Sequence, residues 1–355
     1  MKLVCLSYCV SPHQFPLAKE LAHLIGDENF RNIYDHPMGQ FRVAMGWNPD
    51  LTEPWELIRS EHSELCSQFL LEADVLMCGY RDISLFEQRA ALGKTTIYCA
   101  ERWFKPLWKN VRYSGWLRLL VPQYFLRVCK FMRIMRTSQQ LKCYPMGVHA
   151  RNELLVLARL FGIQNAVQRI VTWGYSVTPG RSSCRNKDDE IIRVMWAGRL
   201  IGWKRCKDVI GAIKKVLKQS KTKQIVLDIY GDGPLRGRLE QLAKGIAEIR
   251  FMGNVANSKI REEMRTHDVY VLSSDYNEGW GAVVSEALEE GMTVLGTYEA
   301  GASATILPET NLYHAGDIKR LSKLLANPPP PTGIGIWSSK AMAERLLADL
   351  KVDLK

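Results

Sequence analysis

Residues 268–291 read DVYVLSSDYNEGWGAVVSEALEEG and predict a strand, a glycine-containing turn and a helix, in that order. The run 269–272 is apolar and rich in β-branched side chains, which is typical of a buried parallel strand. Gly279 and Gly281 then permit a tight turn, and residues 282–288 continue as a helix. A strand that passes through a short turn into a helix is the repeating unit of a parallel α/β sheet.

Two carboxylates flank the predicted start of this helix. Free backbone N–H groups at a helix start favour a diphosphate. Glu278 lies on the loop and is expected to face whatever those phosphates carry. Glu286 lies about two turns into the helix, where it can accept hydrogen bonds from hydroxyl groups. The alternative is that Glu286 is an ordinary solvated residue, because charged helix positions are mostly exposed.

A basic pair follows an earlier predicted strand. Residues 194–200 read VMWAGRL, and the helix expected after them has apolar residues at 209, 210, 213, 216 and 217. Arg199 and Lys204 therefore flank a loop between strand and helix. A guanidinium and an ammonium group placed there can neutralise a diphosphate without a divalent metal.

Two further predicted strands also end in glycine. Residues 225–230 stop at Gly231-Asp232-Gly233-Pro234, and residues 251–255 read FMGNV. In an open parallel sheet, ligands bind at the carboxyl ends of the strands, which is where all these loops are expected.

Taken together, these motifs make residues 191–330 resemble the donor-binding half of a GT-B glycosyltransferase of the family 4 kind, whose members are retaining enzymes. The motifs that agree in order are Gly198-Arg199-Leu200 with Lys204, Gly231-Asp232-Gly233-Pro234, Phe251-x-Gly253-x-Val255, residues 268–274, and Glu278 to Glu286 with Gly291 after. The resemblance implies an α/β fold with two Rossmann-like domains facing each other across a cleft. It also implies a nucleoside-diphosphate sugar as donor substrate, with no cofactor and no metal.

The resemblance assigns roles to individual residues. Arg199 and Lys204 match the basic pair that contacts the donor diphosphate and stabilises the departing charge. Glu278 matches the residue that touches the donor sugar hydroxyls, and Glu286 matches the one that holds the ribose. The remaining donor-binding positions implied by the match are Gly253, Asn254, Trp280, Gly281, Ala282 and Val283. The family commonly has Pro or Ser and then Phe-Gly after the first Glu, whereas this chain has Gly279-Trp280-Gly281, so its sugar selectivity cannot be transferred.

Length and composition agree with a two-domain enzyme. The 355 residues are 46% apolar, which is enough for two separate cores. The nine cysteines are scattered without CxxC spacing, so neither zinc nor a disulfide framework is expected and a reducing cytosol is the simplest setting. Residues 1–10 are interpreted as a first strand rather than a signal peptide, and no stretch of 18 uncharged apolar residues predicts a spanning helix.

The net charge of +11 is concentrated in one segment. Residues 102–142 contain ten Arg or Lys and no Asp or Glu, with aromatic residues interleaved. This composition favours a helix at an anionic membrane interface, which predicts peripheral attachment to the inner face of the cell membrane and a lipid-linked or saccharide acceptor. A solvated basic face next to an acidic acceptor is the alternative. Nucleic acid would favour the same ingredients, but the neighbouring motifs argue against it as a partner.

The amino-terminal half has the pattern of a second alternating α/β unit. Strands are expected at 2–8, 74–78, 95–100 and 168–172, and helices at 14–25, 83–92 and 152–161. Residues 173–180 and the polar run 181–190 form the best candidate linker. We therefore predict an acceptor-binding domain over 1–180, a donor-binding domain over 181–332, and a terminal helix within 333–355 that packs back on the first domain.

Acceptor chemistry is expected in this first half. His13 follows the first strand and His149 opens a helix, so each is a cleft candidate or an ordinary surface histidine. Family members often place a His at the end of the strand that matches 95–100, where this chain has Glu101 beside Arg102. Glu101 is interpreted either as the base for the acceptor hydroxyl or as an ion-pair partner of Arg102.

The resulting hypothesis is a retaining, metal-independent glycosyltransferase that moves a hexose-type unit to an acceptor hydroxyl. By analogy with surface-polysaccharide enzymes, a bacterial role in polysaccharide or lipopolysaccharide assembly is expected. Two alternatives stay open. One is a GT-B epimerase or phosphorylase, and the other is a non-enzymatic basic protein that binds membranes.

Overall fold

The computed structural model describes residues 1–11, 13–40, 43, 51–79, 83–108, 113–180, 191–219 and 224–351. These residues form two compact units. The first comprises the described residues up to 177 together with those from 336 onward, and the second comprises those between 178 and 335. The boundaries predicted at 180 and 332 lie close to these divisions, and the polar part of the predicted linker, 181–190, lies outside the described residues.

The first unit is built on a six-stranded parallel sheet with the strand order β3-β2-β1-β4-β5-β6. Its strands are short and mostly buried, as expected when helices cover both faces of a parallel sheet. They are β1 (Leu3–Cys9), β2 (Phe30–His36), β3 (Glu56–Ile58), β4 (Val75–Cys78), β5 (Thr95–Tyr98) and β6 (Leu141–Cys143).

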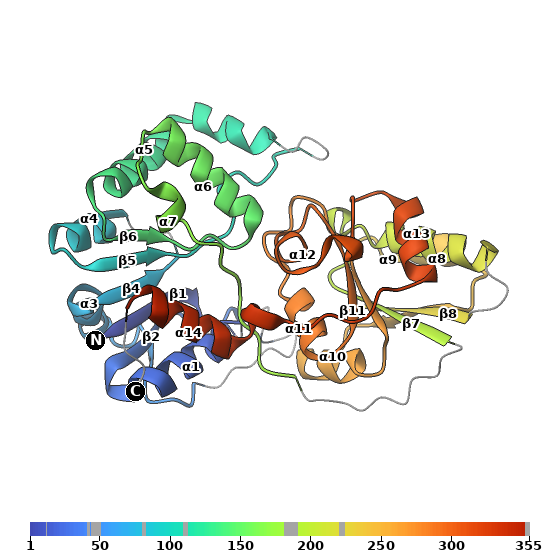
Figure 1. The fold of residues 1–355 in the computed structure, drawn as a ribbon. Coiled ribbons are helices and arrows are strands. Elements are labelled where there is room, and N and C mark those ends of the chain that lie inside the picture. The colour runs from blue at the N-terminus through green and yellow to red at the C-terminus, as the bar shows by residue number, and fades with distance from the viewer. Residues whose placement is uncertain are drawn as a thin grey trace. The chain divides into compact units, whose positions relative to one another are not determined.

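Helices flank this sheet (Figure 1). They are α1 (Phe15–Ile25), α3 (Ser63–Glu72), α4 (Ile83–Ala91), α5 (Pro122–Thr137), α6 (Val148–Leu160), α7 (Ala166–Arg169) and α14 (Ser339–Asp349), with short 3-10 turns at η1 (Asp27–Asn29), η2 (Ser114–Leu120) and η5 (Gly335–Trp337). The last helix, α14, packs against α1, as Figure 1 shows in red against blue. Its Met342, Leu346 and Leu347 are fully buried, and Lys142 on β6 pairs with its Asp349 at 2.6 Å.

The second unit repeats the architecture with the order β12-β11-β10-β7-β8-β9, again all parallel. Its strands are β7 (Ile191–Ala197), β8 (Gln224–Tyr230), β9 (Ile249–Gly253), β10 (Val269–Leu272), β11 (Thr293–Thr297) and β12 (Leu312–Tyr313). Its helices are α8 (Cys206–Gln219), α9 (Arg236–Ala243), α10 (Asn257–Met264), α11 (Val283–Glu289), α12 (Gly301–Ile306) and α13 (Ile318–Ala326), with 3-10 turns at η3 (Gly202–Lys204) and η4 (Glu309–Asn311).

Both sheets have the strand order of a Rossmann fold. Counted within its own unit, each sheet follows the order 3-2-1-4-5-6, so the direction of strand addition reverses between the first and the fourth strand. The prediction of two Rossmann-like units is therefore confirmed. Ligands of such sheets bind outside the carboxyl ends of the strands at this reversal, which in the second unit lies between β7 and β10.

One predicted strand is wrong. Residues 168–172 were expected to be extended, but Ala166–Arg169 form the short helix α7, and only isolated bridges follow at Ile170 and Trp173. The Arg169 guanidinium is buried and donates to the carbonyls of Ser138 and Leu141. Burial lowers the pKa of Arg169. A buried cation that binds backbone carbonyls outweighs the weak local pattern for a strand.

Candidate active site

The carboxyl ends of β7 and β10 bring together two loops of the second unit. The two strands are direct neighbours, with Val269 opposite Val194 and Tyr270 opposite Met195. The Tyr270 hydroxyl donates to the carbonyl of Ala197 at 3.0 Å, which joins the last residue of β7 to β10. Residues 198–204 and 273–282 leave the sheet at the same edge, where strand order reverses.

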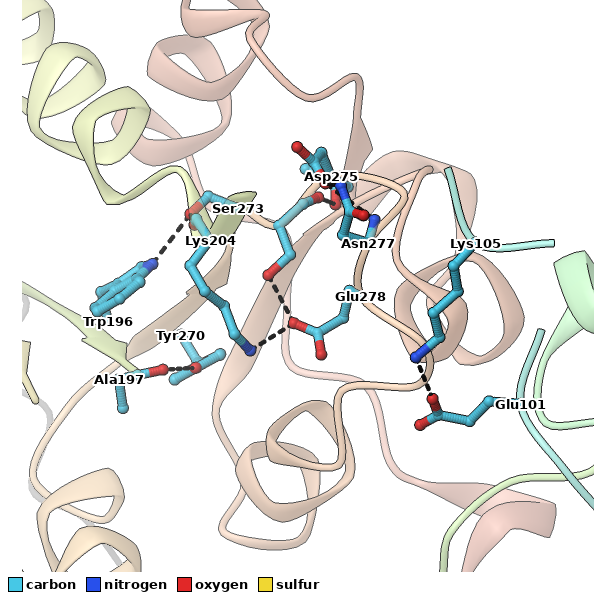
Figure 2. Close-up of polar contacts among 12 residues, drawn as sticks. Glu101, Lys105, Trp196, Ala197, Lys204, Tyr270, Ser273, Asp275, Asn277 and Glu278 are labelled. Carbon is cyan, nitrogen blue, oxygen red and sulfur yellow. Dashed lines mark hydrogen bonds and ion pairs between the residues drawn. The ribbon is translucent and has the colours of Figure 1, made fainter. Parts of the chain in front are cut away.

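An ion pair joins these two loops. The Lys204 Nζ lies 2.5 Å from Oε2 of Glu278, as Figure 2 shows, and both side chains are largely buried. The same oxygen accepts a hydrogen bond from the Ser274 hydroxyl at 2.8 Å. The Trp203 ring lies 4.8 Å from the Lys204 ammonium, in the range of a cation–π contact. The sequence placed Lys204 on the diphosphate and Glu278 on the sugar, and in this structure the two residues bind each other.

Hydroxyl groups at the end of β10 hold this arrangement in place. Ser273 accepts from the Trp196 indole at 3.0 Å and donates to the carbonyl of Lys204 at 2.7 Å. The carbonyl of Ser274 accepts from Thr297 on β11 at 2.5 Å. Sequence reasoning gave Ser273 and Ser274 no role. Two small hydroxyl residues directly after a buried strand at the reversal of strand order were the available signal.

Arg199 lies exposed on the loop after β7. This loop is fixed by close backbone contacts with the loop after β8, because a Cβ at Gly231, where φ is +118°, would lie 2.1 Å from the carbonyl oxygen of Gly198. The Gly231 N–H in turn donates to the carbonyl of Gly253 at the end of β9. Asn254 follows as an exposed residue. The three strand ends predicted to carry ligand loops are thus joined at one edge.

Glu286 is the fourth residue of α11, so it lies one turn into the helix rather than two. It is only 8% exposed, so the alternative of a solvated helix residue is wrong. Burial raises the pKa of its carboxyl above the ordinary value, Arg261 opposes that shift, and Glu290 adds to it. The preceding residues Gly281, Ala282 and Val283 are half-buried, and Gly281 adopts a φ of +93° that favours glycine.

Trp280 was predicted to contact the donor, but its side chain is fully buried. Its carbonyl accepts from the N–H of Ala302 at the start of α12. The tight contact of Gly301 with the Gly279 carbonyl leaves no room for a Cβ at Gly301. Trp280 therefore lies beneath the surface of this turn, and its carbonyl joins the turn to α12.

In the first unit, the acidic and basic candidates after β5 have different partners from those expected. Glu101 pairs with Lys105 at 2.6 Å (Figure 2), and both side chains are about one-third exposed. Arg102 is largely buried and pairs with Glu153 of α6 at 2.7 Å. The predicted alternative, an ion pair between Glu101 and Arg102, is therefore wrong.

The histidine candidates lie on different elements of the first unit. His13 lines a cavity of about 60 Å³ at the carboxyl ends of β1 and β4, the reversal point of this sheet, together with Gln14, Asn32 and Tyr175. Its ring centroid lies 6.0 Å from that of Tyr175. His149 is the second residue of α6 and is half-buried. It is absent from the lining of the His13 cavity.

The described residues show no candidate metal centre and no candidate membrane span. Within the ranges that the structure describes, no group of three or more His, Cys, Asp or Glu side chains is arranged to hold a metal ion. The eight cysteines there are free thiols. No helix in the described part of the chain combines the length and the apolar character needed to cross a bilayer.

Residues 182–327 match the family model "Glycosyl transferases group 1". This segment coincides with the second unit and includes the Lys204–Glu278 pair. The chain therefore carries a glycosyl transferases group 1 domain.

Two mannosyltransferases are similar to part of this chain. The chain is 27% identical over 147 residues to the phosphatidyl-myo-inositol mannosyltransferase of Mycobacterium tuberculosis, which covers 41% of this chain and 34% of that protein. A GDP-mannose-dependent mannosyltransferase of Corynebacterium glutamicum that acts on monoacylated phosphatidylinositol monomannoside is 26% identical over 42% of this chain and 44% of its own length. The chain thus spans less than half the length of these relatives.

Solved structures match nearly the whole chain. The lipopolysaccharide outer core galactosyltransferase WaaB aligns with a TM-score of 0.59 and 14% identity over 99% of both chains. Anabaena HepE in complex with UDP aligns with a TM-score of 0.60 and 13% identity over 99% of this chain and 97% of that one. These likenesses confirm the predicted GT-B fold of two Rossmann-like domains.

Proposed function

We propose that the protein is a glycosyltransferase that moves a sugar from a nucleoside-diphosphate sugar to an acceptor hydroxyl. The observation that carries the proposal is the Lys204–Glu278 pair at the reversal point of the second sheet, within the segment that matches the family model. A cation there can stabilise the negative charge that develops on the phosphate as the sugar is transferred. The adjacent carboxylate can accept hydrogen bonds from sugar hydroxyls.

The roles of the other residues follow from their positions. Arg199 adds a second cation at the same edge of the sheet, and Glu286 is proposed to hold the ribose through its buried carboxylate. In the free protein, Lys204 and Glu278 bind each other. We propose that, when the donor binds, its phosphate takes over the contact of Lys204 and its sugar hydroxyls take over the contact of Glu278. We further propose a retaining reaction that needs no metal. We also propose a role in polysaccharide or lipopolysaccharide assembly, in line with the name of the similar lipopolysaccharide outer core galactosyltransferase structure.

Thermal unfolding in the presence of UDP, GDP, ADP and CMP tests the donor site. A nucleotide at a hundredfold excess over its Kd stabilises the fold by about 2.7 kcal/mol. We expect one of these nucleotides to raise the Tm, and Lys204→Ala and Glu286→Ala to abolish that rise. Lys218→Ala is the matched control, because this exposed cation lies near the end of α8 at the opposite edge of the sheet. If none of the four nucleotides stabilises the wild-type protein, the donor site is refuted.

Activity then separates transfer from the other reactions of this fold. Each of the same two substitutions should lower the transfer rate by about a hundredfold, the effect of one well-placed electrostatic group. The anomeric configuration of the product, read by NMR, tests retention, and activity after EDTA treatment tests independence from metal. An epimerised donor or free sugar phosphate released without an acceptor would instead favour an epimerase or a phosphorylase.

Peripheral attachment to an anionic membrane is a second proposal, carried by exposed apolar residues along η2 and the start of α5. Leu120 and Leu126 are 78% and 65% exposed, and Leu117, Val121 and Phe125 are exposed near them in the chain. Exposed Arg127, Lys130, Arg133 and Arg136 follow on α5. Only some of the aromatic residues in the predicted segment 102–142 are exposed and so able to contact a membrane. Phe104 and Phe131 belong to the core, Trp108, Tyr113 and Phe125 are the large rings that remain exposed, and Lys109 and Arg112 lie outside the described residues.

Flotation with phosphatidylcholine vesicles containing 20% phosphatidylglycerol tests attachment. We expect the wild-type protein to float at low salt and to dissociate as salt screens the cations. The double variant Leu120→Ser/Leu126→Ser should bind at least tenfold more weakly, because a fully buried leucine contributes about 1.5–3 kcal/mol. Leu160→Ser removes a comparably exposed leucine from α6 and serves as control. A wild-type protein that stays at the bottom at low salt would rule attachment out.

A further inference from the structure

A groove of about 350 Å³ lies beside the carboxyl end of β5 in the first unit. Its lining combines charge with aromatic surface, from Glu101, Arg102, Lys105 and Arg127 and from Trp103 and Tyr124. The volume falls at the lower end of the range for small-molecule sites. The His13 cavity of about 60 Å³ is too small for a whole sugar ring by the same comparison.

The wall formed by residues 102–104 is held rigidly from behind. The Glu153 carboxylate accepts from the Arg102 guanidinium at 2.7 Å and from the backbone N–H groups of Trp103 and Phe104 at 3.1 and 3.2 Å. The Tyr124 hydroxyl donates to the carbonyl of Trp103 at 2.7 Å. A ligand therefore meets a wall that is already ordered, which lowers the entropic cost of binding.

The charge of the groove favours an anion. Among the residues that the structure describes, the lining carries three cations and one carboxylate, and counting Glu153 behind Arg102 leaves an excess of one positive charge. The Lys105–Glu101 pair is about one-third exposed on both sides, and such pairs contribute only about 0–1 kcal/mol. Lys105 can therefore turn from Glu101 to a ligand phosphate at little cost.

The rest of the lining favours a sugar or polyol attached to that phosphate. The rings of Trp103 and Tyr124 are half-buried, so each offers a face or edge against which the C–H groups of a ring can pack. Tyr124, Arg127 and Val128 share one face of α5 by their spacing of three and four residues. Exposed Phe125 and Leu126 lie beside that face, where the apolar part of an amphiphile would rest.

We propose that this groove is an acceptor subsite for a sugar or polyol that bears a phosphate group. The inference rests on the proposed transfer function, because an acceptor has meaning only for a transferase. Arg127 and Lys105 would bind the phosphate while Trp103 and Tyr124 pack against the ring. The phosphate can belong to a free sugar phosphate or to a lipid headgroup, since both present the same chemistry.

Binding of myo-inositol 1-phosphate, measured by calorimetry and by ligand-observed NMR, tests the proposal. We expect neutral myo-inositol to bind at least tenfold more weakly than its phosphate. Arg127→Gln and Lys105→Gln should each weaken binding of the phosphate tenfold or more, the scale of one charge-assisted hydrogen bond. Arg159→Gln removes an equally charged, exposed residue of α6 outside the groove and should stay within twofold of the wild type.

A vesicle arm identifies the source of the phosphate. Phosphatidylinositol in phosphatidylcholine vesicles presents the same headgroup on a lipid. A dependence on Arg127 and Lys105 only with vesicles supports a lipid headgroup, whereas the same dependence with soluble inositol phosphate supports a free sugar phosphate. If neither probe distinguishes the groove variants from Arg159→Gln, the subsite is refuted. The groove variants should show the same rise in Tm with nucleotide as the wild type. If the wild type itself shows no such rise, the donor site is refuted, and the groove is judged only by the phosphate-binding results.

Discussion

Replacing Lys204 by Met should destabilise the second unit even when no donor is present. The change removes the ammonium group and keeps most of the apolar stem, so its main effect is to leave the Glu278 carboxylate without its cation. The side chains are only 18% and 11% exposed, which means that water can replace little of the lost interaction. The Ser274 hydroxyl at 2.8 Å remains as a partial compensation.

The magnitude follows from the geometry of the pair. At 2.5 Å, with an effective dielectric constant of about 20, the gross attraction is roughly 6–7 kcal/mol. Desolvation of both groups offsets much of this, and breaking a buried pair by removing one partner costs about 3–5 kcal/mol. Because Ser274 still donates and both groups retain some exposure, we expect about 2–3 kcal/mol. For a unit of about 160 residues this corresponds to a fall in Tm of roughly 4–12 °C.

A double-mutant cycle measures this effect directly. Urea unfolding of the wild type, Lys204→Met, Glu278→Gln and the double variant, all without nucleotide, gives the coupling energy between the two positions. We expect a coupling of at least about 1 kcal/mol, with the double variant more stable than the sum of the single changes predicts. If Lys204→Met lies within about 0.5 kcal/mol of the wild type and the cycle shows no coupling, the two residues are not paired in the free protein and the argument for donor exchange is lost.

Three further expectations follow from other parts of the molecule. Glu286→Gln should raise the Tm at pH 7 while weakening nucleotide binding at least tenfold. Burial raises the pKa of this carboxyl in the folded state, so the ionised carboxylate increasingly opposes folding as pH rises through that pKa. A lower Tm for this variant at every pH would contradict the assignment. The pKa of the Asp228 carboxyl is shifted in the opposite direction to that of Glu286. Hydrogen bonds from His267 and Arg250 outweigh burial and lower it. Asp228→Asn should thus lose about 1–3 kcal/mol at pH 7, a difference that shrinks below about pH 4 in acid unfolding curves. Asp349→Ala removes the acceptor of both Lys142 and Tyr144 and should destabilise the first unit selectively by about 1–3 kcal/mol, detected as earlier hydrogen exchange in α14 while the second unit is unchanged.

The second unit could be predicted in detail from the sequence because its local signals agree with each other. Buried strands, glycine turns and amphipathic helices alternate there, and the predicted strand at 269–272 has the same bounds as β10. The pairing of Lys204 with Glu278 was not predicted. Sequence motifs assign each residue to a ligand, whereas the free protein must satisfy a buried carboxylate with the nearest cation.

The first unit was harder to predict because its decisive contacts are distant in the chain. Glu153 binds the loop at 102–104 across about fifty positions, so no local pattern indicated that Arg102 would turn away from Glu101. The helix α7 replaced a predicted strand for a similar reason, since Arg169 reaches carbonyls near residue 140. Composition did indicate the basic and aromatic segment, but only burial distinguishes the rings that belong to the core from those that are exposed.

The return of the chain to its first unit has a consequence for biosynthesis. Residues 178–335 are inserted between the body of that unit and the helix α14 that completes it. A ribosome adding roughly 5–20 residues per second needs about 8–30 s to translate this insertion. Throughout that time the surface of the nascent first unit that receives Met342, Leu346 and Leu347 stays uncovered, and transiently exposed apolar surface of this kind is prone to aggregate.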